Sequence, residues 1–562
     1  MTNTFQSTSE NTSKVTTIQD SASYQNDPLS VYQLLCHEQQ NNILLESAEI
    51  DKKHLLKSLL LTDAAVKIVC NGNSVTFSAL TLNGESALNF AASELSPHAN
   101  LDFSADKKSF IATFAPVPTD LDEKARLSVI NPLHSLRLFN QLTNDENHPF
   151  SIFLGGAFAF DLMAIAEDLP KVADGENSCP DFVYYLAETL VIIDHECQST
   201  EIVANVFADN DADLTKQNHT VLTERVTRIK ATLSQTITET QVAALKSNVK
   251  AASINAPTSI NKSEELTVDI SDEKFCDIVE QLKENIRAGD IFQVVPSRTF
   301  SLPCVDSIAA YKALKISNPS PYMFYLHDSD FSMFGASPES ALKYQASNRH
   351  VEIYPIAGTR PRGRDKQGNI SLDLDSRIEL ELRQDKKESA EHIMLVDLAR
   401  NDVARVSQPG TRYVADLLKV DRYSHVMHLV SRVCGTLDLE LDALHAYQAC
   451  MNMGTLSGAP KVKATSLIRE VEGKRRGSYG GAVGYVTGTG EMDTCIVIRS
   501  AFVRNNVAQV QAGAGVVYDS DPQSEANETR QKAQAVISAI LLANKETENL
   551  TTSTSVKEQA ND

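Results

Sequence analysis

The sequence predicts a chain of mixed α and β structure, and three features lead to that class. Between Lys67 and about Val206, apolar and β-branched residues alternate in short runs separated by turn clusters, a pattern typical of strands. Asp272 to Ala288 instead carries apolar residues at helical spacing. Residues 246–265 form a polar run with one proline, which predicts a linker between two parts of the chain.

The same patterns divide the chain into five segments. Residues 1–27 have the composition of a disordered tail, and residues 546–562 form a second polar tail. Residues 28–245 and 266–545 then make up an N-terminal and a C-terminal domain on either side of the linker. Hydrophobic residues account for 42% of the 562 positions, which is ample for a large core.

Charge and cysteine content limit the partners that we expect. The net charge of −21 argues against nucleic acid or an anionic membrane as the main partner. The nine cysteines are scattered without a C-x-x-C pair, so neither a disulfide framework nor a zinc site is indicated. No stretch approaches the roughly 20 apolar residues of a membrane span. We therefore expect a cytoplasmic protein.

Two predicted helices each begin with a pair of glutamates three residues apart. Glu388 and Glu391 lead into one helix, and Glu525 and Glu528 lead into the other. Either pair alone fits the ordinary preference for acidic residues in a first helical turn. If the pairs converge, the four carboxylates repel one another unless a cation lies between them. Mg²⁺ is the natural candidate, because it accepts carboxylate oxygens and keeps waters.

Residues that suit an anion lie next to the second acidic helix. Gly513 and Gly515 come directly before it, and glycines let backbone N–H groups approach an anion closely. Arg499 stands among apolar residues in a run that we expect to be a strand, and a half-buried arginine needs an anionic partner. Together these features predict a site for a carboxylate-bearing substrate held through a metal.

Five long segments stand out in the second half of the chain: the Glu388 helix, PIAGTRPRG (355–363), GTLSGAPK (454–461), RRGSYGGAVGY (475–485) and GAGVVYDSDPQSE (513–525). These motifs resemble those of the chorismate-utilising enzymes, and within that family the chain is most similar to the large subunits of the anthranilate synthases. The resemblance implies an α+β fold of two facing antiparallel β-sheets flanked by helices, in a four-layer αββα arrangement.

The resemblance also assigns roles to residues. Glu339 is the acid that protonates a departing hydroxyl, provided that burial raises its pKa. His428, on a predicted strand, takes the ring proton as pyruvate leaves. The implied catalytic residues are Glu339, His428, Gln293 and Thr359. The implied substrate-binding residues are Gly358, Thr359, Tyr479, Arg499, Gly513, Ala514 and Gly515. Glu391 and Glu528 would bind Mg²⁺ directly, and Glu388 and Glu525 would bind it through water.

Two positions separate the reactions of the family. We expect Gln293 on a buried or site-facing wall, and glutamine cannot act as a base, which favours ammonia over water as the nucleophile. Ala357 stands where the aminodeoxychorismate synthases typically carry a lysine that can attack covalently. The resemblance then implies a lyase that makes anthranilate and pyruvate from chorismate and ammonia. The alternatives are an aminodeoxychorismate synthase large subunit, or an inactive regulator that still binds tryptophan.

The resemblance implies two further partners. L-Tryptophan would be a feedback inhibitor, bound through Ser47, Pro321, Tyr322 and Met323. No G-x-C-x-G turn surrounds any of the nine cysteines, so ammonia is expected from a separate glutamine amidotransferase subunit. The implied assembly is a heterotetramer of two large and two small subunits.

Overall fold

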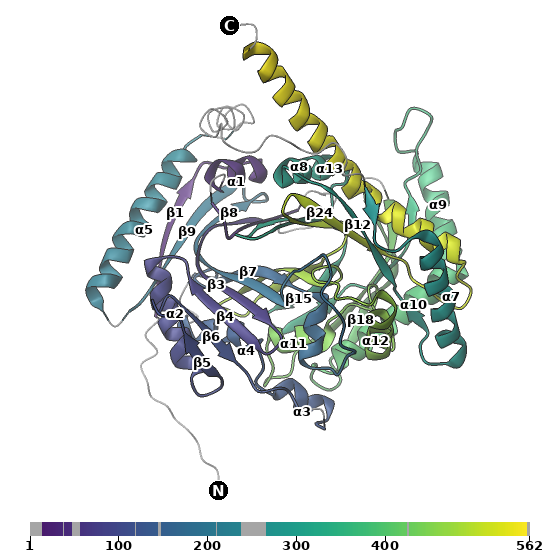
Figure 1. Cartoon of the computed structure of the whole chain (residues 1–562), viewed down its shortest axis with the longest axis horizontal. Coiled ribbons are helices and arrows are strands. Elements are labelled where there is room, and N and C mark those ends of the chain that lie inside the picture. Colours follow the sequence, from purple (N-terminus) through teal and green to yellow (C-terminus); the bar gives the residue numbers. More distant parts are fainter. Residues whose placement is uncertain are drawn as a thin grey trace.

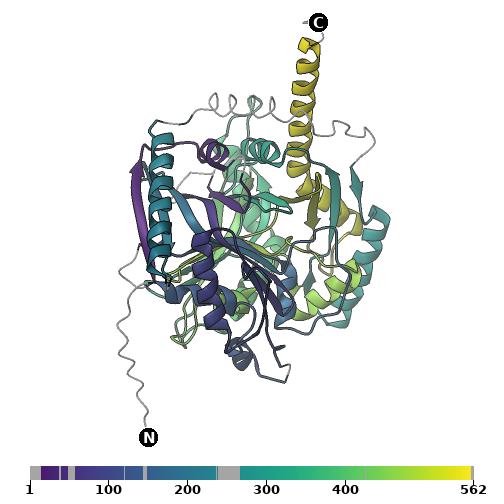
Figure 2. The same cartoon turned by 60° about the vertical axis from the view of Figure 1, so that its left-hand side comes forward.

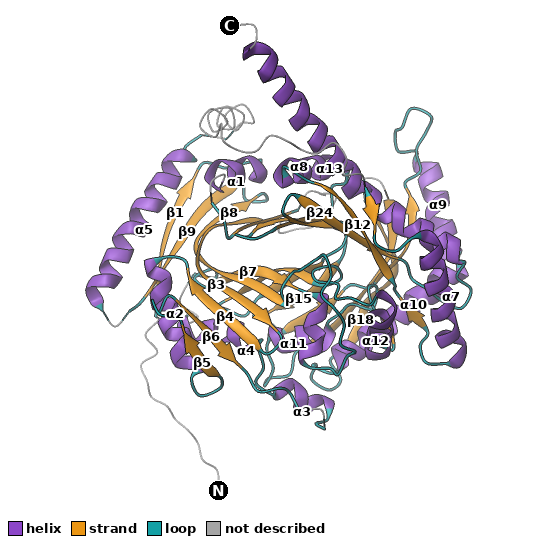
Figure 3. Cartoon of the chain, in the orientation of Figure 1, coloured by secondary structure: helices purple, strands orange, loops and turns teal. Residues whose placement is uncertain are grey.

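The computed structural model describes residues 14–558 except 37–38, 48–56, 119, 144–147, 210, 236, 238–265 and 424–425. The predicted linker therefore lies outside the described residues. Within the described ranges the chain is an α+β protein dominated by antiparallel strands, with helices on the outside (Figure 3).

Strands and helices alternate along both parts of the chain. The strands before residue 238 are β1 (Val15–Ala22), β2 (Asn42–Glu46), β3 (Lys57–Asn71), β4 (Ser74–Ala79), β5 (Asn100–Phe103), β6 (Ser109–Thr113), β7 (Phe153–Phe158), β8 (Phe182–Asp194) and β9 (Ser199–Phe207). Those after residue 265 are β10 (Thr267–Val268), β11 (Gln293–Val294), β12 (Ser297–Pro303), β13 (Tyr322–His327), β14 (Ser332–Ser337), β15 (Ser340–Gln345), β16 (His350–Ile353), β17 (Ile356–Pro361), β18 (Tyr413–Arg422), β19 (Val426–Thr436), β20 (Gly458–Ala459), β21 (Ala482–Thr487), β22 (Met492–Ile496), β23 (Ser500–Arg504) and β24 (Val507–Gly513). The helices are α1 (Pro28–Cys36), α2 (Leu82–Leu95), α3 (Glu123–Ser128), α4 (His134–Arg137), η1 (Leu138–Leu142), η2 (Phe160–Ile165), α5 (Ala212–Thr232), α7 (Asp272–Ala288), α8 (Ser307–Ser317), α9 (Leu372–Gln384), α10 (Lys386–Ala404), α11 (Ala443–Cys450), α12 (Lys461–Glu472) and α13 (Pro522–Glu558).

The helix predicted from Asp272 to Ala288 is confirmed with those bounds as α7. Its apolar positions are buried, Ser271 caps its first turn, and Gly289 ends it in the left-handed conformation with φ +82°. Local periodicity and capping agree here, and the prediction succeeds for that reason.

Two expectations about the first part of the chain are wrong. The disordered tail expected over residues 1–27 contains β1, which pairs with β9 along its whole length, so residues 15–22 belong to the sheet. The strand pattern expected from Lys67 to about Val206 is interrupted after β4, because helix α2 begins at Leu82, where the Thr81 side chain accepts a hydrogen bond from the Gly84 amide. The polar tail expected from residue 546 is helical as far as Glu558, the last residue of α13.

The two parts of the chain share one strand network. β2 pairs antiparallel with β13, and β7 pairs antiparallel with β21, so strands separated by the linker are direct neighbours. With β11 and β20 as a separate small ladder, the other described strands form a single network that closes on itself (Figure 1). Figure 2 shows that strands from both parts remain interleaved when the molecule is turned. Two independent sheets, one for each part, are therefore not observed.

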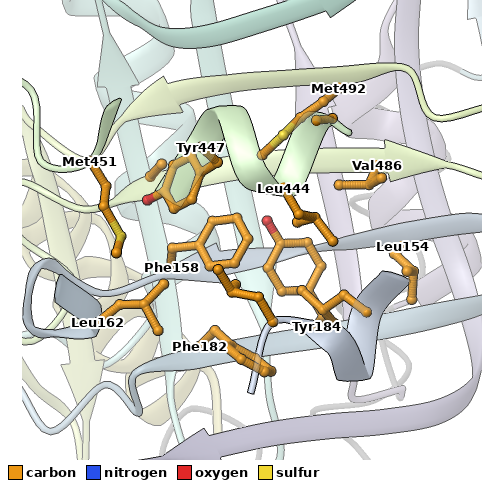
Figure 4. Close-up of a cluster of buried hydrophobic side chains, with 14 of the residues drawn as sticks. Leu154, Phe158, Leu162, Phe182, Tyr184, Leu444, Tyr447, Met451, Val486 and Met492 are labelled. Carbon is orange, nitrogen blue, oxygen red and sulfur yellow. The ribbon is translucent and has the colours of Figure 1, made fainter. Parts of the chain in front are cut away.

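A buried aromatic cluster joins the two parts below the strands (Figure 4). Phe158 of β7 stacks on Tyr447 of α11, with ring centroids 4.2 Å apart and planes inclined by 23°. Tyr184 of β8 lies on the other side of Phe158, at a centroid distance of 4.7 Å. All three side chains are fully or almost fully buried, so this cluster fixes the position of α11 on the N-terminal strands.

Polar contacts from the N-terminal part also hold a loop of the C-terminal part. Arg469 and Asp161 form a buried ion pair at 2.6 Å. The second oxygen of Asp161 accepts a hydrogen bond from the Gly477 amide at 2.9 Å, and Asn177 donates to the Ser478 hydroxyl at 2.8 Å. These contacts fix the backbone just before the tyrosine that the sequence assigned to substrate binding.

The helices carry no sign of a membrane span. Among the described residues, no helix combines the length and the apolar character needed to cross a bilayer.

Replacing Phe158 by alanine should lower the free energy of unfolding by about 3–5 kcal/mol, because it removes a ring that packs against Tyr447 and leaves a cavity. Denaturant titration of the purified variant measures this. Phe103→Ala is the matched control, since that ring is 49% exposed and its loss should cost less than about 0.5 kcal/mol. Equal losses in both variants would contradict the assignment of the cluster.

Candidate active site

Glu339 lies in a break between two strands. β14 ends at Ser337 and β15 starts at Ser340, which leaves Pro338 and Glu339 in the connection between the two strands. The Glu339 side chain is only 5% exposed, and the Thr455 hydroxyl donates a hydrogen bond to its Oε1 at 3.0 Å. Burial raises the pKa of Glu339 to about 8. The carboxyl group is therefore protonated near neutral pH and able to donate a proton.

His428 lies on β19 and faces β17, where it is the register partner of Thr359. The Thr359 hydroxyl and His428 Nδ1 are 2.8 Å apart, which orients the imidazole ring. Burial, and to a smaller extent the charge of Arg499, lowers the pKa of His428 to about 3. Its Nε2 is buried and has no hydrogen-bond partner in the described part of the chain. A neutral imidazole with one unused nitrogen is suited to exchanging a proton with a ligand.

Gln293 and Tyr479 converge on the glycine-containing segment after β24. A Cβ added to Gly515 would lie 2.8 Å from Gln293 Nε2, and one added to Gly513 would lie 3.1 Å from the Tyr479 hydroxyl. Gln293 is 6% exposed, which confirms the expected burial, and its Oε1 lacks a partner among the described residues. The absence of side chains at the two glycines thus leaves room in front of both polar groups.

One expected anion donor is already used. The amide of Ala514 donates to the carbonyl of Pro296 at 3.2 Å, so this N–H is not available to a substrate. The expectation that all amides from Gly513 to Gly515 bind substrate is therefore wrong for Ala514. The amide is consumed because β24 continues its antiparallel contact with the chain before β12.

Arg499 does not lie within a strand. It has φ +48° and stands between β22 and β23, so the single strand predicted across this run is wrong. Its guanidinium forms no ion pair with any carboxylate in the described ranges, yet its charge acts on both Glu339 and His428. An arginine held without a protein counter-ion between an acid and an imidazole is suited to bind a carboxylate of a ligand.

The four predicted carboxylates lie near one another at the start of α10 and α13. The pKa of Glu391 is raised to about 7, mainly by burial; Lys387 opposes this rise, and the charges of Glu388, Glu525 and Glu528 contribute to it. Burial also raises the pKa of Glu525, which is 6% exposed. The charges of the other three glutamates act on Glu391, so the two acidic pairs lie in one region of the molecule.

This region fits a divalent cation better than it fits four bare carboxylates. Without an ion, Glu388 is paired with Arg360 at 2.8 Å and Glu528 with Lys532 at 2.7 Å, whereas Glu391 has only Lys387 at 3.9 Å. The three neighbouring carboxylates contribute to the raised pKa of Glu391, and a bound cation would offset their repulsion.

A more compact ligand set exists elsewhere but is already satisfied. Within the described ranges, the only trio of metal-ligating side chains within 4.8 Å of one another is His350, Glu352 and Cys434. Glu352 also accepts hydrogen bonds from Tyr354 and Arg432, so this carboxylate is neutralised by protein groups.

Sequence reasoning missed Lys532. Its Nζ donates to the carbonyl of Gly513 at 3.0 Å and pairs with Glu528, and its charge lowers the pKa of both Glu339 and Glu525. The acid and the paired glutamates therefore border the same space as the glycine segment. The signal was available, because Lys532 lies one helical turn after Glu528.

The residues predicted to bind the inhibitor also come together, at a different place. Met323 of β13 is the register partner of Glu46 of β2, and Tyr322 and Ser47 are the next residues along the two segments. Glu46 accepts hydrogen bonds from Tyr311 at 2.6 Å and Lys315 at 2.7 Å. Two segments separated by almost half of the chain are thus neighbours.

Comparisons with known proteins agree with this geometry. The family model of chorismate binding enzymes matches residues 98–538. Anthranilate synthase component 1 of Vibrio cholerae serotype O1 is 56% identical over 522 residues, covering 92% of this chain and 95% of that protein. The corresponding protein of Escherichia coli K12 is 53% identical over 521 residues, covering 92% and 96%.

Solved structures show the same relationship. The crystal structure of anthranilate synthase component I from Streptococcus pneumoniae TIGR4 matches with TM-score 0.59 and 27% identity, over 87% of this chain and 93% of that chain. The menaquinone-specific isochorismate synthase of Escherichia coli shares the fold, with TM-score 0.61 and 18% identity over 94% and 95%.

The fold, the site and the family model together define a chorismate binding enzyme. Within that family the chain belongs to anthranilate synthase component 1, at 56% identity to the Vibrio cholerae member. The resemblance inferred from the motifs is confirmed.

Replacing Thr455 by valine should raise the pKa of Glu339 above about 8, because the hydroxyl that stabilises the ionised carboxylate is lost. Infrared difference spectra recorded against pH follow the protonated carboxyl band, with Glu339→Gln identifying that band. Ser466→Ala, which removes an exposed hydroxyl bonded only to its own helix, is the control and should leave the midpoint unchanged. A midpoint for Glu339 near 4.5, the ordinary value, would contradict the buried environment.

Proposed function

We propose that this chain forms anthranilate, pyruvate and water from chorismate and ammonia, the first committed step of tryptophan biosynthesis. The observation that carries the proposal is the convergence of a protonated Glu339, a neutral His428 and an unpaired Arg499 on one space. An acid, a proton acceptor and a carboxylate receptor are the three protein groups that this reaction needs.

The proton transfers follow from the states of these groups. Ammonia attacks C2 of chorismate while Glu339 gives its proton to the departing C4 hydroxyl, which leaves as water. His428 then accepts the ring proton at C2 as the bond between C3 and the ether oxygen breaks, and the ring becomes aromatic. The released enolpyruvate takes up one proton and becomes pyruvate. Thr359 orients His428 through Nδ1, which keeps Nε2 directed at the ring.

Substrate binding would use polar groups that border the space between Glu339, His428 and the glycine segment. Arg499 would bind one carboxylate of chorismate, and the Tyr479 hydroxyl and the glycine segment would border its enolpyruvyl side. Gly358 and Thr359 supply a further polar edge, since Thr359 is exposed on β17. The unpartnered Oε1 of Gln293 can accept a hydrogen bond from ammonia, whereas a glutamine has no means to activate water as a base.

Mg²⁺ would be held by Glu391 and Glu528 directly, with Glu388 and Glu525 holding its waters. The ion would neutralise a substrate carboxylate and the surrounding glutamates. Arg360 and Lys532 already hold Glu388 and Glu528 in place, so the acidic region is oriented before the ion binds.

The partners follow from the same reaction. The relatives are called component 1, which implies a second component, and we propose that it is a glutamine amidotransferase supplying ammonia in a heterotetramer of two large and two small subunits. L-Tryptophan would bind beside Ser47, Pro321, Tyr322 and Met323 and inhibit the reaction.

We also infer the finer division of the fold. Residues 28–245 would contribute part of the inhibitor site, and residues 266–545 would form the chorismate-binding domain. The curved layers of strands in Figure 3, with helices outside, support two facing antiparallel sheets in a four-layer αββα arrangement.

The purified chain, given chorismate, Mg²⁺ and ammonium salt without glutamine, should produce anthranilate, detected by its fluorescence. EDTA or Glu391→Gln should abolish at least about nine-tenths of this product, and L-tryptophan should reduce it. Chorismate consumed without anthranilate would favour an aminodeoxychorismate reaction instead. No consumption at all would favour an inactive tryptophan-binding regulator.

The value of kcat/KM should fall as pH rises through about 8, because Glu339 must carry its proton to act as the acid. No fall is expected from His428 at low pH until about 3, because it is already neutral above that pKa. Glu339→Gln should lower kcat by about 10²–10⁴-fold and remove the alkaline limb. An unchanged alkaline limb in that variant would assign the limb to another group.

A further inference from the structure

Tyr322 belongs to the segment proposed to bind the inhibitor, yet its side chain reaches towards the acid. Its phenol donates a hydrogen bond to Asp493 Oδ1 at 3.1 Å. Burial raises the pKa of Tyr322 well above its usual range and Asp493 adds to this effect, whereas a hydrogen bond with Ser340 opposes it. The phenol therefore stays protonated and lies against Asp493 on β22 and Ser340 on β15.

The backbone of the same residue touches the other side of the acidic turn. Tyr322 is the register partner of Ser337, the last residue of β14. The Ser337 hydroxyl accepts a hydrogen bond from the amide of Glu339 and donates to its carbonyl, both at 3.3 Å. Tyr322 thus contacts the residues on both sides of Pro338 and Glu339.

The position of Glu339 depends on these contacts. Between Ser337 and Ser340 only two residues are available, so any shift of either serine moves the carboxyl group. The Glu339 carbonyl is also bonded to the Ile496 amide at 3.0 Å, on the strand that carries Asp493. Tyr322 is therefore linked to the turn through β14, β15 and β22.

The backbone next to Tyr322 is also connected to β2, the other segment proposed to bind the inhibitor. Met323, its neighbour, pairs with Glu46, and Glu46 is held by Tyr311 and Lys315. A ligand bound at this end of the ladder would lie next to the backbone of residue 322. Packed cores transmit small shifts of this kind because they cannot deform continuously.

We propose that Tyr322 is a positioning residue for Glu339, and that tryptophan inhibits by displacing the acid through Tyr322. The inference rests on the proposed function for its ligand and goes beyond it in naming the coupling residue. Since coupling between two bound ligands is reciprocal, chorismate must weaken tryptophan binding by the same factor by which tryptophan weakens chorismate binding.

Tyr322→Phe tests this directly, because it keeps the ring beside the inhibitor segment and removes only the hydroxyl. Tryptophan affinity, measured by calorimetry, should change by less than about threefold, while the concentration for half-inhibition should rise at least about tenfold. In the wild-type chain, tryptophan should also shift the infrared titration midpoint of Glu339 by at least about 0.5 pH unit, and this shift should be lost in the variant.

Two further variants separate coupling from general damage. Ser340→Ala removes the hydroxyl that contacts Tyr322 and leaves every residue assigned to the inhibitor unchanged, and it should weaken inhibition in the same direction. Tyr325→Phe is the matched control. Tyr325 lies on the same strand, and the substitution removes a buried hydroxyl that contacts the Ser307 hydroxyl at 2.8 Å. Tryptophan should inhibit this variant as it inhibits the wild-type chain.

The outcomes distinguish this inference from the proposed function. Parallel loss of binding and inhibition in Tyr322→Phe would make Tyr322 an inhibitor contact only and would overturn the coupling. An unchanged midpoint shift in that variant would overturn it too. If the wild-type chain does not bind tryptophan, the inhibitor site itself is wrong. If the chain makes no anthranilate, the proposed function fails, but the effect of tryptophan on the titration midpoint of Glu339 still tests the coupling.

Discussion

The site depends on one buried ion pair, between Glu472 and Arg476. Both side chains are 1% exposed and their charged atoms are 2.5 Å apart. Arg476 donates to the carbonyls of Leu456 at 2.8 Å and Val295 at 2.6 Å, and Glu472 accepts from the Ser297 amide at 2.7 Å. The pair thereby joins the chain segments that carry Gln293, Thr455 and Tyr479. A buried charge without its partner is strongly destabilising. Loss of either Glu472 or Arg476 should therefore displace all three segments.

Above this frame, glutamates of one region have different surroundings. Glu339 is buried and burial raises its pKa, so it keeps its proton near neutral pH, whereas Glu388 and Glu528 form ion pairs with Arg360 and Lys532. The surroundings make the difference, since all three residues are glutamates. Arg499 and Lys532 also act on Glu339 and keep its pKa from rising further. The same region thus holds a carboxylic acid and a group of acidic side chains that would suit a cation.

Local sequence patterns predicted what local forces determine. The α7 bounds, the helix of Glu388, the break at Glu339 and the burial of Gln293 all follow from periodicity, capping or a proline. What failed depends on partners far along the chain. β1 is polar and forms only because β9 pairs with it, and Arg499 leaves its strand at a positive φ that an apolar run cannot reveal. Lys532 could have been predicted from the sequence, because it lies four residues after Glu528 on the same predicted helix.

The pairing of β2 with β13 has a consequence for synthesis of the chain. The edge of β2 is complete by residue 46, but its partner begins at Tyr322. At a translation rate of about 5–20 residues per second, that edge waits roughly 15–60 s before the strand that covers it leaves the ribosome. During this interval an apolar strand with unpaired amides is open to other nascent chains. The strand pairing that joins the two segments proposed to bind the inhibitor therefore also leaves an apolar edge open to chaperones while the chain is being made.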